Sequence, residues 1–306
     1  MKIGIDLGGS HIGVGLIEDS NIIASKDKIL TREDRVNIKE TIVKEIVSMI
    51  KELCKENNVK EEDLEIIGIA SPGTISNGKI VKAGNLGVKD FDLVRELKKV
   101  FNNTIIIRND AKCAAMAEKV YGTMKNYSDA VFLCLGTGIG GAVFMNGKLL
   151  EPKRYSGFEM GHMILNKGGR LCTCGKRGCF ETYASIKALK MKVTETLDID
   201  SDISGEYLRE VILKEEVFEK HNEAVIQDLE TFLDYLQTGI CNYIDIFEPE
   251  IVVLGGSFSY YEKNPIFQML IDKINAPKTT FNEGIKPKIV AATFKNDAGI
   301  IGATLM

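Results

Sequence analysis

The spacing of hydrophobic and polar residues predicts alternating strands and helices along the whole chain. Short apolar runs bounded by glycine, asparagine, aspartate or proline indicate strands, whereas apolar residues that recur every three or four positions indicate helices. The strands expected on this basis are Lys2–Leu7, Val14–Glu18, Ile22–Leu30, Leu64–Ala70, Thr104–Arg108, Ala130–Leu135, Ala142–Met145, Leu149–Leu150 and Ile251–Ser257. The helices expected are Arg35–Glu56, Asp90–Phe101, Asn109–Tyr121 and most of 185–247, with a final helix or turn over Asp297–Ala303.

The two halves of the chain begin alike. The first strand is followed by Gly8-Gly9-Ser10, and the strand Ala130–Leu135 is followed by Gly-Thr-Gly-Ile-Gly-Gly at residues 136–141. Each half thus opens with a β-hairpin whose first turn is rich in glycine. We infer an internal duplication, with an α/β fold of two lobes at residues 1–118 and 119–289. The C-terminal segment 290–306 is a candidate to complete the first lobe.

Composition and charge narrow the class of protein without identifying it. The chain has 306 residues, of which 44% are hydrophobic and 27% charged, as is usual for a globular protein. Its net charge of -4 gives no reason to expect nucleic acid or an anionic membrane as a partner. The N-terminal residues lack a signal-peptide pattern, and no apolar run reaches the roughly 20 residues that span a bilayer. We therefore expect a cytoplasmic protein.

One segment gathers potential metal ligands. Cys172, Cys174 and Cys179 lie close together among glycines, and His162 lies a short way upstream. Three thiolates and one imidazole complete a tetrahedral zinc shell with no open position, so this zinc would be structural. The alternatives are redox thiols, a disulfide pair and a hydrogen-bonded loop histidine. The remaining cysteines are expected to be buried core thiols; they are Cys54, Cys113, Cys134 and Cys241.

The glycine turns predict a phosphate site. Their backbone amides can approach phosphate oxygens closely, and an acid at the end of the preceding strand can hold Mg²⁺. The residues expected to hold MgATP are Asp6, Gly8, Gly9, Ser10, Gly136, Thr137, Gly138, Gly255 and Gly256, with the last two facing the nucleobase. Turns without a ligand are the alternative. A Rossmann fold is rejected because residues 136–141 lead into a strand, not a helix.

Asp110 is the candidate general base. It lies between an apolar strand and a helix, where its alternative role is to cap the helix. Phosphoryl transfer to a sugar needs a positioned hydroxyl, a base and neutralisation of the phosphate charge. The residues expected to hold the sugar hydroxyls are Asn85, Asn109, Glu159, His162 and Glu181.

Together these motifs resemble the ROK family, whose members are repressors and sugar kinases with the actin-like, ribonuclease H-like ATPase fold. The resemblance covers essentially the whole chain. It rests on Asp6–Ser10, Leu135–Gly141 and Ile251–Ser257 as nucleotide motifs and, most specifically, on the zinc knuckle at 157–181. In the family, the aspartate of an Asn-Asp-Ala motif deprotonates the sugar hydroxyl, and Asp110 fills that place.

The resemblance implies ATP-dependent phosphorylation of a hexose at its primary hydroxyl. MgATP is expected between the lobes, the sugar near the knuckle, and the chain in a dimer or tetramer. Glucose is the first expectation; N-acetylmannosamine, N-acetylglucosamine, allose and fructose remain alternatives. A repressor is disfavoured because the first strand starts at Lys2 and leaves no room for a DNA-binding segment. A sugar sensor without catalytic activity is a further alternative.

The chain departs from the family pattern at three places. Many members have a lysine three residues after the Ser or Thr of the first motif, where this chain has Gly13. Asn-Asp-Ala is followed by Lys112 instead of asparagine, and this lysine is expected to be exposed to solvent. Glucokinase-like members often carry a tryptophan shortly after Asn-Leu-Gly, but this chain has no tryptophan and Val88 lies in that region. His11 is expected either to point into the nucleotide site or to pack locally.

Overall fold

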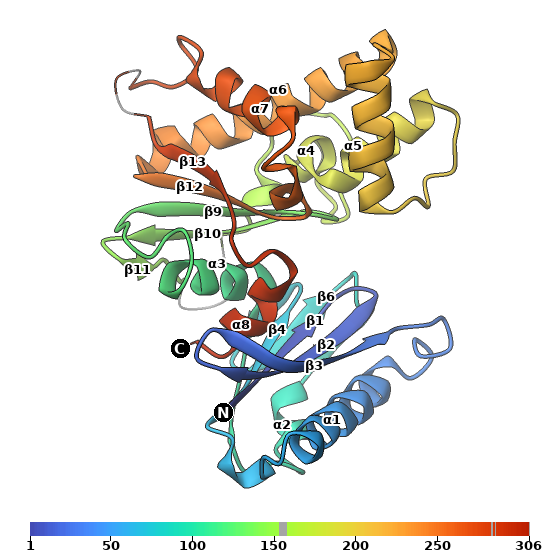
Figure 1. The fold of residues 1–306 in the computed structure, drawn as a ribbon, viewed down its shortest axis with the longest axis vertical. Coiled ribbons are helices and arrows are strands. Elements are labelled where there is room, and N and C mark those ends of the chain that lie inside the picture. The colour runs from blue at the N-terminus through green and yellow to red at the C-terminus, as the bar shows by residue number, and fades with distance from the viewer. Residues whose placement is uncertain (153–157, 283, 285, 306) are drawn as a thin grey trace. The chain divides into compact units, whose positions relative to one another are not determined.

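The computed structural model of the protein describes residues 1–152, 158–282, 284 and 286–305. Contacts divide the chain into two compact units (Figure 1). The first comprises Met1–Lys125, Leu150–Phe158 and Asn296–Met306, and the second comprises Asn126–Leu149 and Glu159–Lys295. Because such contacts do not show which parts fold alone, the domain limits 1–118 and 119–289 stay a prediction. The start of the expected knuckle, residue 157, lies outside the described residues.

The first unit is built on a five-stranded sheet of order β3-β2-β1-β4-β8. Its strands are β1 (Lys2–Leu7), β2 (His11–Glu18), β3 (Asn21–Ile29), β4 (Ile66–Ser71) and β8 (Thr104–Asn109). The hairpins β1–β2 and β2–β3 are antiparallel, whereas β1, β4 and β8 run parallel to one another. The carboxyl ends of three strands therefore meet at one edge, which holds Asp6, Ser71 and Asn109.

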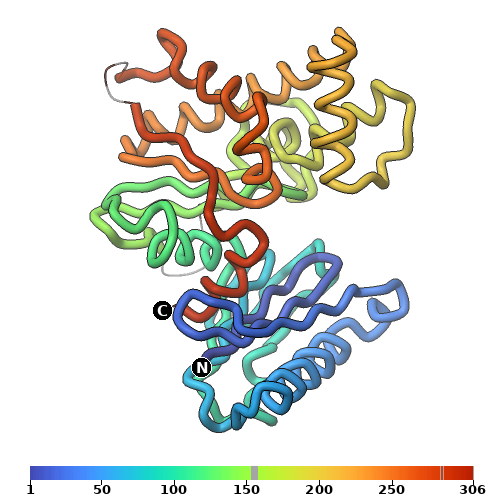
Figure 2. The backbone as a smooth tube through the Cα atoms, viewed as in Figure 1, coloured from blue at the N-terminus to red at the C-terminus, as the bar shows by residue number. Residues whose placement is uncertain are grey.

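Helices cover this sheet. They are α1 (Ile38–Glu56), α2 (Leu93–Leu97), α3 (Asp110–Val120) and α8 (Ala298–Ala303), with a short 3₁₀ turn η1 (Glu61–Asp63). The apolar positions that predicted α1 are buried, although the helix begins later than expected and Val36 stays exposed. α8 lies directly against β1 (Figure 2). Gly4 and Gly68 make this possible, because a Cβ on either would lie within about 2.0 Å of a carbonyl oxygen of α8.

A small antiparallel sheet corrects the sequence-based prediction. Its strands are β5 (Thr74–Ser76), β6 (Lys79–Ala83) and β7 (Val88–Phe91). The expected helix Asp90–Phe101 is confirmed only over Leu93–Leu97. Its start is wrong, because β7 includes its first residues and α2 begins after Asp92, whose side chain accepts a hydrogen bond from Arg95 N. The missed signal was Asn77-Gly78, which turns with both φ angles positive, as Asn-Gly hairpins do.

The second unit repeats the strand arrangement of the first. Its sheet has the order β11-β10-β9-β12-β13. The strands are β9 (Ala130–Leu135), β10 (Ile139–Met145), β11 (Lys148–Leu149), β12 (Ile251–Gly256) and β13 (Lys288–Ala291). β9 and β10 are antiparallel, while β9, β12 and β13 are parallel. The two sheets thus share one topology, which confirms the inferred duplication. The second turn leads into strand β10, so the rejection of a Rossmann fold is also confirmed.

The helices of the second unit lie mostly between residues 181 and 275. They are α4 (Glu181–Ala184), α5 (Ile186–Thr196), a π-helical segment η3 (Tyr207–Glu219), α6 (Glu223–Phe247) and α7 (Pro265–Asn275). Short 3₁₀ turns are η2 (Met160–His162) and η4 (Ser257–Tyr261), with η5 (Lys295–Asp297) at the junction of the two units. The apolar pattern predicted the helices of 185–247, whereas α7 and β13 were not expected from the sequence.

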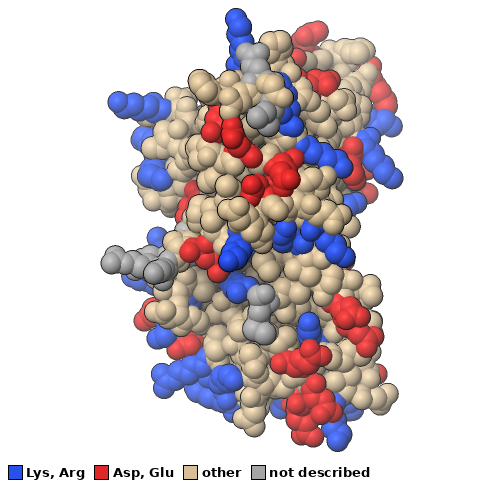
Figure 3. All heavy atoms as spheres, turned by 90° about the vertical axis from the view of Figure 1, so that its left-hand side faces the viewer, with Lys and Arg blue, Asp and Glu red and all other residues tan. Residues whose placement is uncertain are grey.

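Three of the four cysteines expected in the core are buried. On the face drawn in Figure 3, positive and negative side chains are intermixed. No helix among the described residues has the length and apolar character needed to cross a bilayer. Cys54, Cys113 and Cys241 are buried as expected, whereas Cys134 is only half-buried near the end of β9.

Candidate functional site

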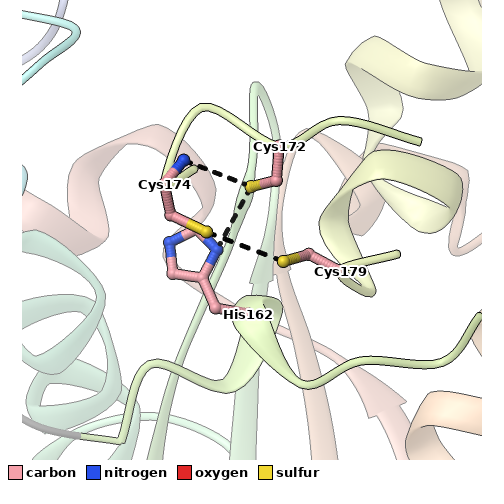
Figure 4. Close-up of side chains that lie close together, drawn as sticks. All are labelled: His162, Cys172, Cys174 and Cys179. Atoms are coloured by element: carbon pink, nitrogen blue, oxygen red, sulfur yellow. Dashed lines mark hydrogen bonds between the residues drawn. The ribbon is translucent and has the colours of Figure 1, made fainter. Parts of the chain in front are cut away.

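His162, Cys172, Cys174 and Cys179 converge in the second unit (Figure 4). Their ligand atoms all lie within 4.8 Å of one another. Cys174 Sγ is 3.7 Å from Cys179 Sγ, and His162 Nδ1 is 3.6 Å from Cys172 Sγ. Gly175 and Gly178 have φ angles of 90° and 83°, so glycine permits the turns between the cysteines. The predicted ligand set is therefore brought together.

These distances fit a tetrahedral metal site. With Zn–S of about 2.3 Å and Zn–N of about 2.0–2.1 Å, a regular tetrahedron requires about 3.8 Å between two sulfurs and about 3.5 Å between sulfur and nitrogen. Both values match the separations observed. Burial raises the pKa of the Cys172 thiol to about 12, and the neighbouring Glu181 carboxylate adds to the rise. A bound cation would favour the thiolate in such surroundings.

Glu181 joins the cysteine cluster to the second glycine turn. Its Oε1 accepts a hydrogen bond from Cys172 Sγ at 3.1 Å and lies 3.5 Å from His162 Nδ1. Its Oε2 lies so close to Gly138 that a Cβ at this glycine would be only 2.6 Å away. Glu181 and His162 were predicted to hold the sugar, and Gly138 to hold phosphate. The structure places all three side by side.

The second glycine turn also meets the glycines of β12. Because β9 and β12 are parallel, Gly256 is paired with Leu135, and a Cβ on Gly256 would lie 2.7 Å from the Leu135 carbonyl oxygen. A cavity of about 460 Å³ opens beside them and is lined by Gly136, Thr137 and Ser257. The two segments predicted to hold the nucleotide in this unit thus border one cavity.

The first glycine turn lies beside two acids. Asp6 is paired with Gly13 across the β1–β2 hairpin, and a Cβ on Gly13 would lie 3.0 Å from Asp27 Oδ1. Burial raises the pKa of Asp6 to about 6, and the charge of Asp27 adds to the rise. A carboxylate in this position is therefore unfavourable by itself and would be stabilised by a cation.

Two contacts of the first turn were not predicted from the sequence. Gly9 lies against Asn85, since a Cβ on this glycine would be 3.2 Å from Asn85 Cβ. Arg35, in the loop before α1, donates a hydrogen bond to the Gly9 carbonyl oxygen at 2.6 Å. No sequence motif marks this arginine. The ring of His11 packs against Gly8, so the local alternative describes this residue.

Asn109 and Asp110 stand at the start of α3. Asn109 caps the helix by accepting a hydrogen bond from Lys112 N at 3.3 Å, and it donates one to the Gly73 carbonyl oxygen at 3.2 Å. Asp110 Oδ1 accepts from Ala111 N at 2.8 Å. The capping role therefore belongs to Asn109. Lys112 is only 3% exposed, so its expected exposure to solvent is wrong.

The predicted site residues thus fall into two groups, one in each unit. The first unit holds Asp6, Gly8, Gly9, Ser10, Asn85, Asn109 and Asp110, and Ser10 is exposed at the turn. The second unit holds Gly136, Thr137, Gly138, Glu159, His162, Glu181, Gly255, Gly256 and the three knuckle cysteines. Glu159 is exposed just before η2, where its carbonyl oxygen accepts a hydrogen bond from His162 N.

Comparison with known proteins shows which family the chain resembles. The family model described as the ROK family matches residues 2–306. A glucokinase of Thermotoga maritima is 31% identical over 321 residues, which cover 98% of this chain and 95% of that protein. A xylose repressor of Bacillus subtilis is 32% identical, over 84% of this chain and 64% of that protein.

Two solved structures have a similar fold. The ROK hexokinase of Thermus thermophilus has a TM-score of 0.79 at 26% identity, covering 99% of this chain and 96% of that one. A ROK family glucokinase of Streptomyces griseus, solved in complex with glucose and AMPPNP, shares the fold with a TM-score of 0.79 at 23% identity, over 99% and 97% of the two chains. These likenesses confirm the two-lobed, mixed α/β actin-like fold and support a sugar kinase. The chain belongs to the ROK family.

Proposed function

We propose that the protein transfers the γ-phosphate of ATP to the primary hydroxyl of a hexose, and that its substrate is glucose. One observation carries the proposal: Glu181 touches the cysteine cluster through Oε1 and lies beside Gly138 through Oε2. An acceptor for sugar hydroxyls therefore adjoins the turn whose amides suit a phosphate. That juxtaposition is what direct transfer between the two substrates requires.

The residues divide the chemistry between them. Asp110 is proposed to accept the proton of the primary hydroxyl as its oxygen bonds to the γ-phosphorus, while the bond from that phosphorus to the β-phosphate oxygen breaks and ADP leaves. Asn85, Asn109, Glu159, His162 and Glu181 are proposed to orient the sugar. The turns at 8–10 and 136–138 are proposed to hold the phosphates, with Gly255 and Gly256 against the base.

Two metal ions complete the proposal. Mg²⁺, held by Asp6, would supply positive charge to the phosphate oxygens. Zinc, held by His162, Cys172, Cys174 and Cys179, would fix the knuckle without activating water, because its four ligands fill the shell. The chain's part is to keep Glu181 and the Nε2 atom of His162 in place for sugar hydroxyls, because Nδ1 faces the cysteines.

The test is ADP release from MgATP with glucose, mannose, fructose, allose, N-acetylglucosamine and N-acetylmannosamine. We expect turnover with glucose well above the other sugars, and ³¹P NMR of the product should show a phosphate ester on the primary hydroxyl. Faster turnover of another sugar would keep the kinase and replace the substrate. A folded, zinc-loaded protein that binds a sugar calorimetrically but releases no ADP would contradict the kinase and favour a sugar sensor.

A further inference from the structure

We infer that Lys187 supplies positive charge to the β- and γ-phosphates of the bound nucleotide; this rests on the proposed kinase function. Lys187 is the second residue of α5 and carries no role in the motifs that identify the family. Its position, its charge and the composition of the opposite turn each support the inference.

The first turn of α5 is fastened to the second glycine turn. The Lys187 backbone N–H donates a hydrogen bond to the Gly136 carbonyl oxygen at 3.2 Å. Two residues before Lys187, the buried Ser185 caps α5 by accepting a hydrogen bond from Ala188 N at 3.1 Å. The backbone of Lys187 is therefore held within one hydrogen bond of the turn proposed to bind phosphate.

Lys187 lies where the nucleotide cavity meets the surroundings of Glu181. It lines the cavity of about 460 Å³ together with Gly136 and Thr137. It also lines a second cavity of about 560 Å³, whose walls include Thr137 and Glu181. A side chain at the junction of these cavities can reach the end of a nucleotide that points from the β12 glycines toward Glu181.

The ammonium group of Lys187 is available for a ligand. α5 carries two other lysines, and both are engaged: Lys190 Nζ donates to the Ile203 carbonyl oxygen at 3.1 Å, and Lys192 Nζ pairs with Glu195 at 3.1 Å. Within the described part of the chain, Lys187 Nζ forms no hydrogen bond or ion pair, and its side chain is exposed. Lysine acts as a mobile point charge that suits phosphate.

The first turn explains why such a charge is needed. Gly13, which is paired with Asp6, carries no charge, and Asp27 occupies the space beside it. The nearby Arg35 already donates to the Gly9 carbonyl oxygen. Since phosphoryl transfer depends on neutralising the phosphate charge, a lysine beside the second turn would supply positive charge that the acids near the first turn do not.

The test compares Lys187→Met with Lys192→Met. Lys192 is on the same helix but lines only the larger cavity and is paired with Glu195, so it is a matched control. Calorimetry with AMP, ADP and ATP in the presence of Mg²⁺ separates contacts to the adenosine end from contacts to the outer phosphates. We expect Lys187→Met to weaken ADP and ATP binding about tenfold to a hundredfold, with AMP binding within twofold of the wild type and Lys192→Met unchanged.

Kinetics give a second readout. Lys187→Met should raise the KM for MgATP and leave the KM for the sugar unchanged, and Lys187→Arg should restore most of the loss because the charge returns. An equal loss for AMP, ADP and ATP would overturn the inference, since the residue would then act on the adenosine end or on the loop as a whole. No loss for any nucleotide would overturn it as well. Wild-type protein that binds none of the three would instead overturn the proposed function, and the inference with it.

Discussion

The two glycine turns hold equivalent places in two sheets of the same strand order, yet their surroundings differ. The first follows Asp6-Leu7 and the second follows Cys134-Leu135, so an acid in one sheet corresponds to a thiol in the other. Asp27 lies close to the first turn, whereas α5 and Glu181 lie beside the second. The duplication kept the backbone path and changed the side chains around it.

This difference indicates a division of labour. The parallel strands fix where backbone amides are exposed, because their carboxyl ends meet at one edge of each sheet. In the proposed reaction, the chemistry would come from segments added beside that edge: the start of α3 with Asp110 in the first unit, and the knuckle with α5 in the second. We expect changes in the first unit to act on the chemical step and the Mg²⁺ ion, and changes in the second to act on substrate binding.

The sharpest test of this division is Asp110→Asn. A positioned general base contributes about 10²–10⁴-fold to rate, so kcat should fall by a factor in this range while the Kd of the sugar changes little. The fold should persist, because Asn109 and not Asp110 caps α3. An ADP-release assay measures kcat, and calorimetry measures the Kd of the sugar.

Asp92→Asn is the matched control for this prediction. Asp92 is also an aspartate at a helix start of the first unit, where it caps α2. Its replacement should leave kcat unchanged. If Asp110→Asn kept most of the wild-type kcat, Asp110 would not be the base.

The second prediction concerns the knuckle. Cys174→Ala should lower the zinc content from one per chain to none and reduce the melting temperature by several degrees, because a structural zinc contributes directly to folding. The KM for the sugar should rise, since His162, which lies 3.5 Å from Glu181 Oε1, would no longer be fixed by the metal. Cys241→Ala, in α6 of the same unit, should keep its zinc. Wild-type protein purified without chelator and found free of zinc would refute the metal site.

The sequence predicted the scaffold and the knuckle better than their surroundings. Strands next to glycine turns are marked by local pattern, and the short spacing of Cys172, Cys174 and Cys179 limits the chain to a few geometries. The bounds of the helix expected at Asp90–Phe101 were wrong, because charged and apolar residues alternate similarly in an edge strand followed by one helical turn. The Asn77-Gly78 turn was a readable signal for the correct structure.

The rest of the site depends on contacts between distant segments. The hydrogen bond from Arg35 to Gly9 joins a loop to a turn 26 residues away, and nothing local in the sequence marks it. The burial of Lys112 likewise follows from packing around α3 and not from its place in a polar motif. The contact between Glu181 and Gly138 required the fold, although each residue was predicted separately.

The third prediction compares two glycines of the second turn. A Cβ on Gly138 would lie 2.6 Å from Glu181 Oε2, whereas a Cβ on Gly136 would have only Ser257 Oγ near it, at 4.0 Å. Gly138→Ala should therefore displace Glu181 and lower kcat/KM for the sugar about tenfold to a hundredfold, which is the loss of a hydrogen bond to a charged group. Gly136→Ala should have a smaller effect. Equal effects of the two variants would mean that Glu181 is not coupled to this turn.

The smallest effect is expected from a change that makes the first turn more like the second. This change should stabilise the protein, whereas the variants above weaken its function or its fold. The pKa of Asp6 is raised from 3.8 to about 6 in the folded chain. The fold therefore favours the neutral form of Asp6. The stability that this form contributes is fully present below about pH 4 and is lost as the pH rises through 6. Asp6→Asn, which carries no charge, should stabilise the protein at pH 8 by at most about 3 kcal/mol, and by less because the side chain keeps some contact with solvent.

Thermal unfolding of the zinc-loaded protein without added Mg²⁺, from pH 4 to pH 8, measures this difference. The stability gained by Asp6→Asn should be near zero at pH 4 and should grow until it levels off above pH 6, while the variant loses affinity for MgATP. Asp27→Asn, a control at the neighbouring acid, should show a smaller gain, because it removes only the weaker cause of the raised pKa of Asp6. A variant that is less stable at pH 8 would show that the fold already stabilises this carboxylate. The first turn would then hold a carboxylate that needs no cation to stabilise it. The two turns would differ in sequence but not in the stability of the fold around them.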